Sequence, residues 1–225
     1  MKTTNETINK IKSIEWEMFS AVNEGQDKAS CQEDRETFEG MRAAQFEAWP
    51  AEATSSYLAD LETALKDNRS LVEEKYIHMM QTTDPAQYEA LLPRVKMPAE
   101  TAVALAAELS DILLKQTLVL HEEYPFITGR GRPLYSELDY ITTSVETYQL
   151  CELLTYSEKT LAALLAYVKD PERDGASMVK NIQENTIRFY GFDSLEQAEA
   201  LAKSHAERPG TPMVFGCAGG SCEEE

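Results

Sequence analysis

Two cysteines near the C-terminus, Cys217 and Cys222, are separated by the four residues Ala-Gly-Gly-Ser. Because these small residues let the chain bend, the two thiols can close on each other or on a metal ion. Two thiolates do not complete a tetrahedral zinc site, but they suffice for a soft metal such as copper(I). The spacing favours metal binding by Cys217 and Cys222, with Cys31 as a further ligand, or disulfide exchange between them. The cofactor class is then a soft or transition metal (zinc, copper or iron), and the alternative is a chance pair on an unfolded tail.

Cys31 follows Ser30, and Glu33 stands three residues beyond that serine. The pattern is typical of a capping box, which would place Cys31 in the first turn of a helix. Free backbone N–H groups and the helix dipole stabilise a thiolate there, whereas the nearby acidic residues oppose it. We therefore predict Cys31 as a reactive catalytic thiol or metal ligand, and the alternative is a small residue that starts a helix.

Two arginines flanked by glycines, Arg130 and Arg132, stand out in an acidic chain. Glycine lets the backbone approach a ligand, and arginine binds carboxylate or phosphate through two parallel hydrogen bonds. The loop therefore predicts an anion subsite. The alternative is pairing with local acids such as Glu122, Glu123 or Glu137.

A helical enzyme acting on a small anion would also need a general base. Glu17 and Glu146 are the candidates, provided that burial raises the pKa of the carboxyl. A metal site at Glu74, His78 and His121 is a weaker alternative, because the Glu-x-x-His spacing of carboxylate di-iron proteins is absent from the sequence.

The composition excludes several classes of protein. The chain has 225 residues and a net charge of −18 from 21 basic and 39 acidic residues. Such a charge repels phosphate backbones and anionic membranes, so we expect neither nucleic acid nor membrane as partner. We see no membrane span and no signal peptide, and expect a cytoplasmic protein whose partner is a small anionic molecule or a metal ion.

Apolar residues recur at helical spacing in eight segments, and no segment alternates as a strand does. We predict an all-α fold, a single domain of about eight helices over residues 1–206. Asp84-Pro85 with Gln87, and Ser194 with Gln197, predict helix starts, and Gly191 predicts a helix end. Residues 207–225, rich in proline and glycine, are predicted to form a flexible arm that carries the C-x4-C pair.

Several motifs together resemble an uncharacterised bacterial family, a domain of unknown function. They cover about residues 10–200 and include Trp16-Glu17-Met18-Phe19, Ala29-Ser30-Cys31-Gln32, Gly129-Arg130-Gly131-Arg132-Pro133, and Glu146-Thr147-Tyr148 followed by Thr155-Tyr156-Ser157-Glu158-Lys159-Thr160-Leu161. The resemblance implies no activity. It draws attention to further polar positions. From these we take Arg42, Gln45 and Tyr76, together with Tyr148, as substrate-binding candidates.

Three hypotheses follow. The first is a thiol-based or soft-metal handling protein that uses Cys31, the arginine subsite and the dithiol arm. The second is a helical enzyme that binds a small anionic substrate through arginine and uses a glutamate base. The third is a non-catalytic sensor or interaction module.

Overall fold

The computed structural model describes residues 5–22, 32–129, 131–140, 142–173 and 176–206. Within these ranges all regular structure is helical, which confirms the all-α fold. The α-helices are α1 (Asn5–Ser20), α2 (Arg35–Glu47), α3 (Ala51–Lys66), α4 (Leu71–Thr83), α5 (Pro85–Leu91), α6 (Glu100–Glu123), α7 (Pro125–Thr128), α8 (Val145–Leu153), α9 (Glu158–Val168), α10 (Met178–Phe189) and α11 (Leu195–Ala206).

The prediction of about eight helices is too low, because the described residues form eleven. Helices α5 and α7 have seven and four residues, which is too short to show a periodic pattern. Helix α4 is absent from the eight apolar segments for a different reason. Its buried residues include Glu74, Lys75 and His78, and these polar side chains interrupt the apolar stripe that marks a helix.

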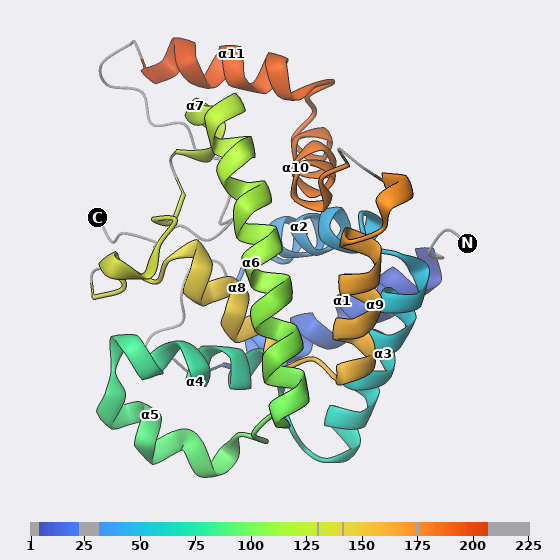
Figure 1. Cartoon of the computed structure of the whole chain (residues 1–225), viewed down its shortest axis with the longest axis vertical. Helices are drawn as coiled ribbons and strands as arrows, with labels where there is room; N and C mark the ends of the chain where they lie inside the picture. Colours follow the sequence, from blue (N-terminus) through green and yellow to red (C-terminus); the bar gives the residue numbers. More distant parts are fainter. Residues whose placement is uncertain (1–4, 23–31, 130, 141, 174–175, 207–225) are drawn as a thin grey trace.

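Helix α6 is the long central element, and α8, α9 and α10 pack along it (Figure 1). Helix α1 contacts α2, α3 and α4, and α2 packs closely on α10. Figure 1 shows α11 across one end of the molecule and the α4–α5 hairpin at the other. The main core lies between these helices, and a smaller one joins α11 to the end of α6 through Leu120, Tyr124, Ile187, Leu195 and Ala198.

Most predicted helix ends are confirmed. The Asp84 carboxylate accepts a hydrogen bond from the Gln87 N–H at 3.1 Å, and the Ser194 hydroxyl accepts one from the Gln197 N–H at 3.2 Å. Helix α11 spans Leu195–Ala206, up to the last residue that the structure describes. Helix α2 begins at Arg35 with Asp34 as its N-cap, because the Asp34 carboxylate accepts from the Thr37 N–H, and the predicted helix start at Ser30 lies outside the described residues. Cys31 and the predicted arm, 207–225, lie outside the described residues.

Gly191 ends α10 in the left-handed conformation, with φ = 84°. The Gly191 N–H donates to the Arg188 carbonyl at 3.0 Å, and the Phe192 N–H donates to the Ile187 carbonyl at 3.0 Å. These two bonds form a Schellman motif, which turns the chain from α10 toward α11.

We expect Gly191→Ala to lower the free energy of unfolding by about 1 kcal/mol, because a Cβ atom disfavours this φ. A Cβ atom there would contact nothing, so the cost is conformational and Gly191→Asn should recover part of it. Urea unfolding measures both values. The control is Gly131→Ala, where the nearest atom to a Cβ would be 3.7 Å away. Equal stability of Gly191→Ala and the native protein would contradict this account of the turn.

Candidate functional site

A buried ion network of Glu15, Arg42, Glu152 and Lys75 lies where α1, α2, α4 and α8 meet. The Arg42 guanidinium contacts both oxygens of Glu15, with Nε donating to Oε2 at 2.7 Å. Its Nη1 donates to Glu152 at 3.0 Å and to Gln45 at 2.8 Å. The Arg42 and Glu15 side chains are 13% and 2% exposed, so these charges are largely removed from water.

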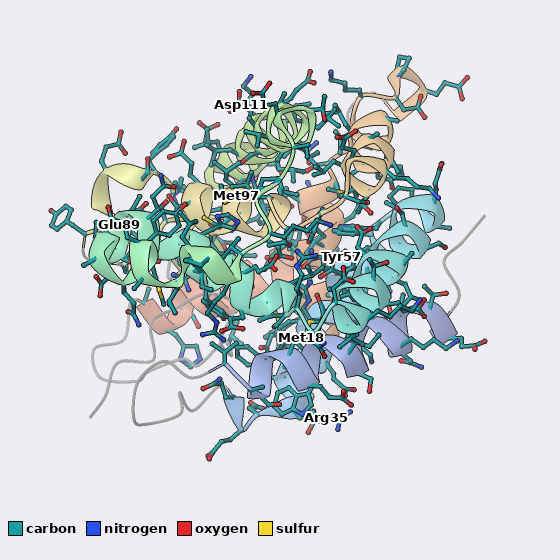
Figure 2. The ribbon with its side chains drawn as sticks, turned by 90° about the horizontal axis from the view of Figure 1, so that it is seen from below. Met18, Arg35, Tyr57, Glu89, Met97 and Asp111 are labelled. Carbon is teal, nitrogen blue, oxygen red and sulfur yellow. The ribbon has the colours of Figure 1, made fainter. Side chains whose placement is uncertain are left out.

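Three tyrosines complete the hydrogen bonding of this network. The Tyr57 hydroxyl donates to Glu15 at 2.7 Å, and the Tyr156 hydroxyl donates to Glu152 at 2.7 Å. Lys75 Nζ donates to the Tyr148 hydroxyl at 2.8 Å and lies 3.5 Å from Glu152. Figure 2 shows Tyr57 in the crowded interior, whereas Arg35 and Glu89 lie at the edge of the molecule. Every charge of the network therefore has a partner of opposite sign.

The network holds its groups in fixed protonation states. Burial alone would raise the pKa of Glu152, but the charges of Arg42 and Lys75 outweigh it and hold that pKa far below the usual value. Burial would lower the pKa of Lys75, but Tyr148 and Glu152 outweigh it and raise that pKa. Burial also raises the pKa of Tyr57 and Tyr156. Charges this stable suit a structural frame better than proton transfer at neutral pH.

Sequence reasoning placed Arg42 and Gln45 at a site but missed Glu15 and Lys75. Glu15 lies in register with the buried residues of α1, Ile8, Ile11 and Met18, at spacings of three and four. A carboxylate on the apolar face of an amphipathic helix is a signal of a buried ion pair, because an isolated charge there would be too costly. Lys75 occupies the corresponding position on α4, between the buried residues Val72 and Met79.

Arg132 lies in the loop between α7 and α8, and it differs from the cations of the network. Its Nη1 donates to the Thr143 carbonyl at 2.9 Å, and its guanidinium carbon lies 4.8 Å from the centre of the Tyr148 ring. Its Nε atom is buried and has no hydrogen-bond partner among the described residues. In that part of the chain the same holds for His205 Nδ1. No described carboxylate forms an ion pair with Arg132, and Glu123, one of the predicted local acids, pairs with Lys180 instead.

The loop that carries Arg132 is fastened to the first turn of α8. The Val145 N–H donates to the Pro133 carbonyl at 2.8 Å, and the Glu146 N–H donates to the Leu134 carbonyl at 3.1 Å. The Glu146 carboxylate in turn accepts from the Ser136 N–H at 2.9 Å. Glu146, a predicted general base, therefore contacts the backbone of this loop.

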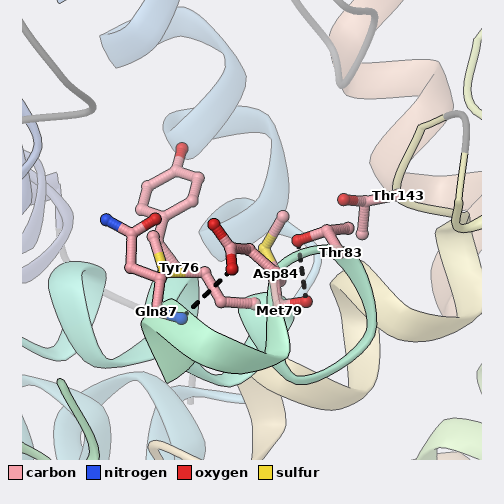
Figure 3. Close-up of a pocket in the computed structure, with 7 residues that line it drawn as sticks. Tyr76, Met79, Thr83, Asp84, Gln87 and Thr143 are labelled. Carbon is pink, nitrogen blue, oxygen red and sulfur yellow. Dashed lines mark hydrogen bonds between the residues drawn. The ribbon is translucent and has the colours of Figure 1, made fainter. Parts of the chain in front are cut away.

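A groove lies beside Arg132, between the α4–α5 hairpin and the loop before α8. We call it the α4–α5 groove; it is open to one side, has a volume of about 440 Å³ and is lined by Tyr76, Met79, Met80, Thr83, Asp84, Gln87 and Thr143. In Figure 3, Thr143 reaches the groove from a different segment than the other labelled residues. The carbonyl of Thr143 also accepts the hydrogen bond from Arg132, so the guanidinium contacts a residue of the groove wall. Lys75 Nζ, 5.0 Å from the Tyr76 ring and 4.4 Å from the Tyr148 ring, links the groove to the ion network.

The structure thus brings together Arg42, Gln45, Tyr76, Tyr148 and Arg132 of the predicted substrate-binding set. Glu17, the other predicted base, is exposed and lacks the burial which that role requires. Glu74 is buried in a two-bond pair with Arg69, at 2.7 Å for each bond. Arg130 lies outside the described residues.

The thiol hypothesis rests on Cys31, Cys217 and Cys222, which all lie outside the described residues, and it stays a prediction. Cys151 lies within the described residues and is buried, and this burial raises the pKa of its thiol to about 12. In the described part of the chain, no three His, Cys, Asp or Glu side chains gather as metal ligands do. No described helix is both long enough and apolar enough to cross a membrane.

Comparison with known proteins gives one match. A family model described as "Protein of unknown function (DUF4125)" matches residues 5–200. No curated protein matches the chain. No solved structure matches it either.

We expect Glu152→Gln to lower the free energy of unfolding by about 3–5 kcal/mol at pH 7, because Lys75 loses its counter-charge and Arg42 loses one of its two. The charged Glu152 stabilises the folded protein above the pKa of an unfolded glutamate, about 4.3, and this contribution is lost as the pH falls toward the lower folded pKa. The difference between variant and native protein should therefore shrink below about pH 4.3.

Urea unfolding from pH 3 to pH 8 measures this difference. The matched control is Glu108→Gln, which removes the exposed pair with Lys169 and should cost less than about 1 kcal/mol. A cost for Glu152→Gln that equals the control, or that does not change with pH, would be inconsistent with a buried ionised Glu152.

Cys151 should resist thiol reagents in the folded protein, because it is buried and protonated at neutral pH. The measurement uses a Cys31→Ser/Cys217→Ser/Cys222→Ser variant, in which Cys151 is the remaining thiol, and follows disulfide exchange with an aromatic disulfide reagent. We expect modification to be far slower in buffer than in urea. Equally fast modification in both would show that Cys151 is accessible.

Proposed function

Because this chain belongs to the DUF4125 family, a family of unknown function, we propose its function from the site alone: it binds a small anionic molecule at Arg132, beside the α4–α5 groove. The proposal concerns binding of a carboxylate or a phosphate group. These are the groups that a guanidinium binds most specifically.

One observation carries this proposal: Arg132 has a buried donor, Nε, with no acceptor among the described residues. A buried donor without a partner lowers the stability of the folded protein, and a buried charge lowers it more. A ligand that supplies the missing acceptor removes this cost, so its binding is favoured. The neighbouring cations differ in this respect. Arg42 is paired with Glu15 and Glu152, and Lys75 is paired with Glu152.

The orientation of Arg132 supports a two-bond contact. Nη1 donates its hydrogen bond to the Thr143 carbonyl, whereas neither Nε nor Nη2 makes a hydrogen bond to a described residue. Nε and Nη2 form one edge of the guanidinium, and this edge matches the two oxygens of a carboxylate or phosphate. The Tyr148 ring and the Thr143 carbonyl fix the plane of the group, which lowers the entropy that ligand binding must overcome.

The test follows the NMR signal of the Arg132 Nε–Hε group while inorganic phosphate or acetate is added to the full chain at pH 7. We expect this signal to shift and saturate, since Nε donates to the bound anion. Arg132→Lys identifies the signal by its loss. In that variant, backbone amide shifts near Thr143 should report an affinity lower by about tenfold or more, because lysine lacks the two-donor edge.

The matched control is Arg188→Lys, which changes an arginine of α10 that is 55% exposed and pairs with Glu184. It should leave anion binding unchanged. An Arg132 signal that does not move with either anion, or equal affinities of Arg132→Lys and Arg188→Lys, would refute the proposed function.

A further inference from the structure

Binding of an acid group at Arg132 leaves open what the α4–α5 groove holds, and the groove carries a second, opposite charge at Asp84. We propose that the ligand is a small zwitterion of the amino-acid class: its acid group binds Arg132, its carbon chain lies against Tyr76, Met79 and Met80, and its ammonium group binds Asp84. This inference rests on the proposed function and specifies the class of ligand.

Asp84 is held in place by two helices. It ends α4, its N–H donating to the Met80 carbonyl at 2.9 Å, and it begins α5 as the N-cap. One carboxylate oxygen accepts from the Gln87 N–H at 3.1 Å. No Lys, Arg or His of the described residues forms an ion pair with Asp84, and Figure 3 shows its carboxylate directed to the same side of the hairpin as the Tyr76 ring. A fixed carboxylate without a counter-charge at a groove wall suits a cationic group of a ligand.

The groove surface near Asp84 suits a short carbon chain. Tyr76 offers an aromatic ring, and Met79 and Met80 offer thioether side chains, which adapt to ligands of irregular shape. The volume of the groove, about 440 Å³, lies in the usual range for small-molecule sites. Thr143 borders the groove and its carbonyl accepts from Arg132, so Arg132 contacts the groove wall of which Asp84 is also a part.

The overall charge of the protein also favours a zwitterion. The chain carries a net charge of −18, which repels a free anion over about 8 Å at physiological salt. A zwitterion has no net charge and approaches without this repulsion. Its acid group still gains the local contact with Arg132, and its ammonium group gains the contact with Asp84.

Three probes with the same six carbons separate these contributions: hexanoate, norleucine and 6-aminohexanoate. Norleucine carries its ammonium group beside the carboxylate, and 6-aminohexanoate carries it at the far end, so the two amino acids offer a short and a long separation of the opposite charges. Affinities come from NMR titration of the full-length protein, read at the Arg132 Nε–Hε signal and at backbone amides of α4 and α5.

We expect one of the two amino acids to bind about fivefold more tightly than hexanoate, the scale of an exposed ion pair, because Asp84 is exposed. Asp84→Asn should abolish this advantage without changing the affinity for hexanoate. Asparagine is also a favourable N-cap, so α5 is retained. The matched control is Asp34→Asn, which changes the N-cap of α2 in the same way and should leave the advantage intact.

The outcomes distinguish this inference from the proposed function. If all three probes shift Arg132 with equal affinity, or if the advantage survives in Asp84→Asn, the zwitterion inference is overturned and anion binding at Arg132 stands. If none of the three shifts the Arg132 signal, both are overturned.

Discussion

The pairing of Arg42 with two buried carboxylates constrains the rest of this fold. The Arg42 side chain is 13% exposed and needs a compensating charge. Removing a guanidinium from water costs more free energy than the packing of one apolar side chain usually returns. Glu15 of α1 and Glu152 of α8 supply that charge, and Lys75 of α4 balances the second carboxylate. Tyr57 of α3 joins through its hydroxyl, so five helices must meet at one place with their side chains in register.

The site follows from this arrangement. Because Glu152 contacts both Arg42 and Lys75, the position of Lys75 is fixed, and Lys75 in turn holds the Tyr148 hydroxyl. The ring of Tyr148 supports the Arg132 guanidinium from α8, the same helix whose first turn fastens the Arg132 loop. The network compensates its own cations, and Arg132 stands beside it with an unpaired Nε and with a hydrogen bond to Thr143 of the groove wall. A rigid, charge-balanced frame next to an unpaired cation is the physical basis of the proposed binding function.

The sequence predicted the features that depend on local pattern. The amphipathic helices, the caps at Asp84 and Ser194 and the turn at Gly191 all follow from spacing and residue type. The errors arose where tertiary contacts override local pattern. Glu74, Lys75 and His78 interrupt the apolar pattern of α4. Glu74 pairs with Arg69, just before the helix, and Lys75 pairs with the distant Glu152, while burial lowers the pKa of His78. Glu17 was chosen although the spacing places Glu15, not Glu17, on the buried face of α1; what the spacing does not reveal is that Arg42 of α2 is its partner.

The most direct test of this account is a crystal structure of the protein soaked in selenate, an oxyanion whose selenium gives an anomalous signal. The account predicts an anomalous peak at the Nε and Nη2 edge of Arg132, bordering the α4–α5 groove, and none at Arg42 or Lys75, whose charges are already compensated. A peak at Arg42 or Lys75, or none at Arg132, would contradict the claim that the ion network leaves Arg132 as the cation available to a ligand.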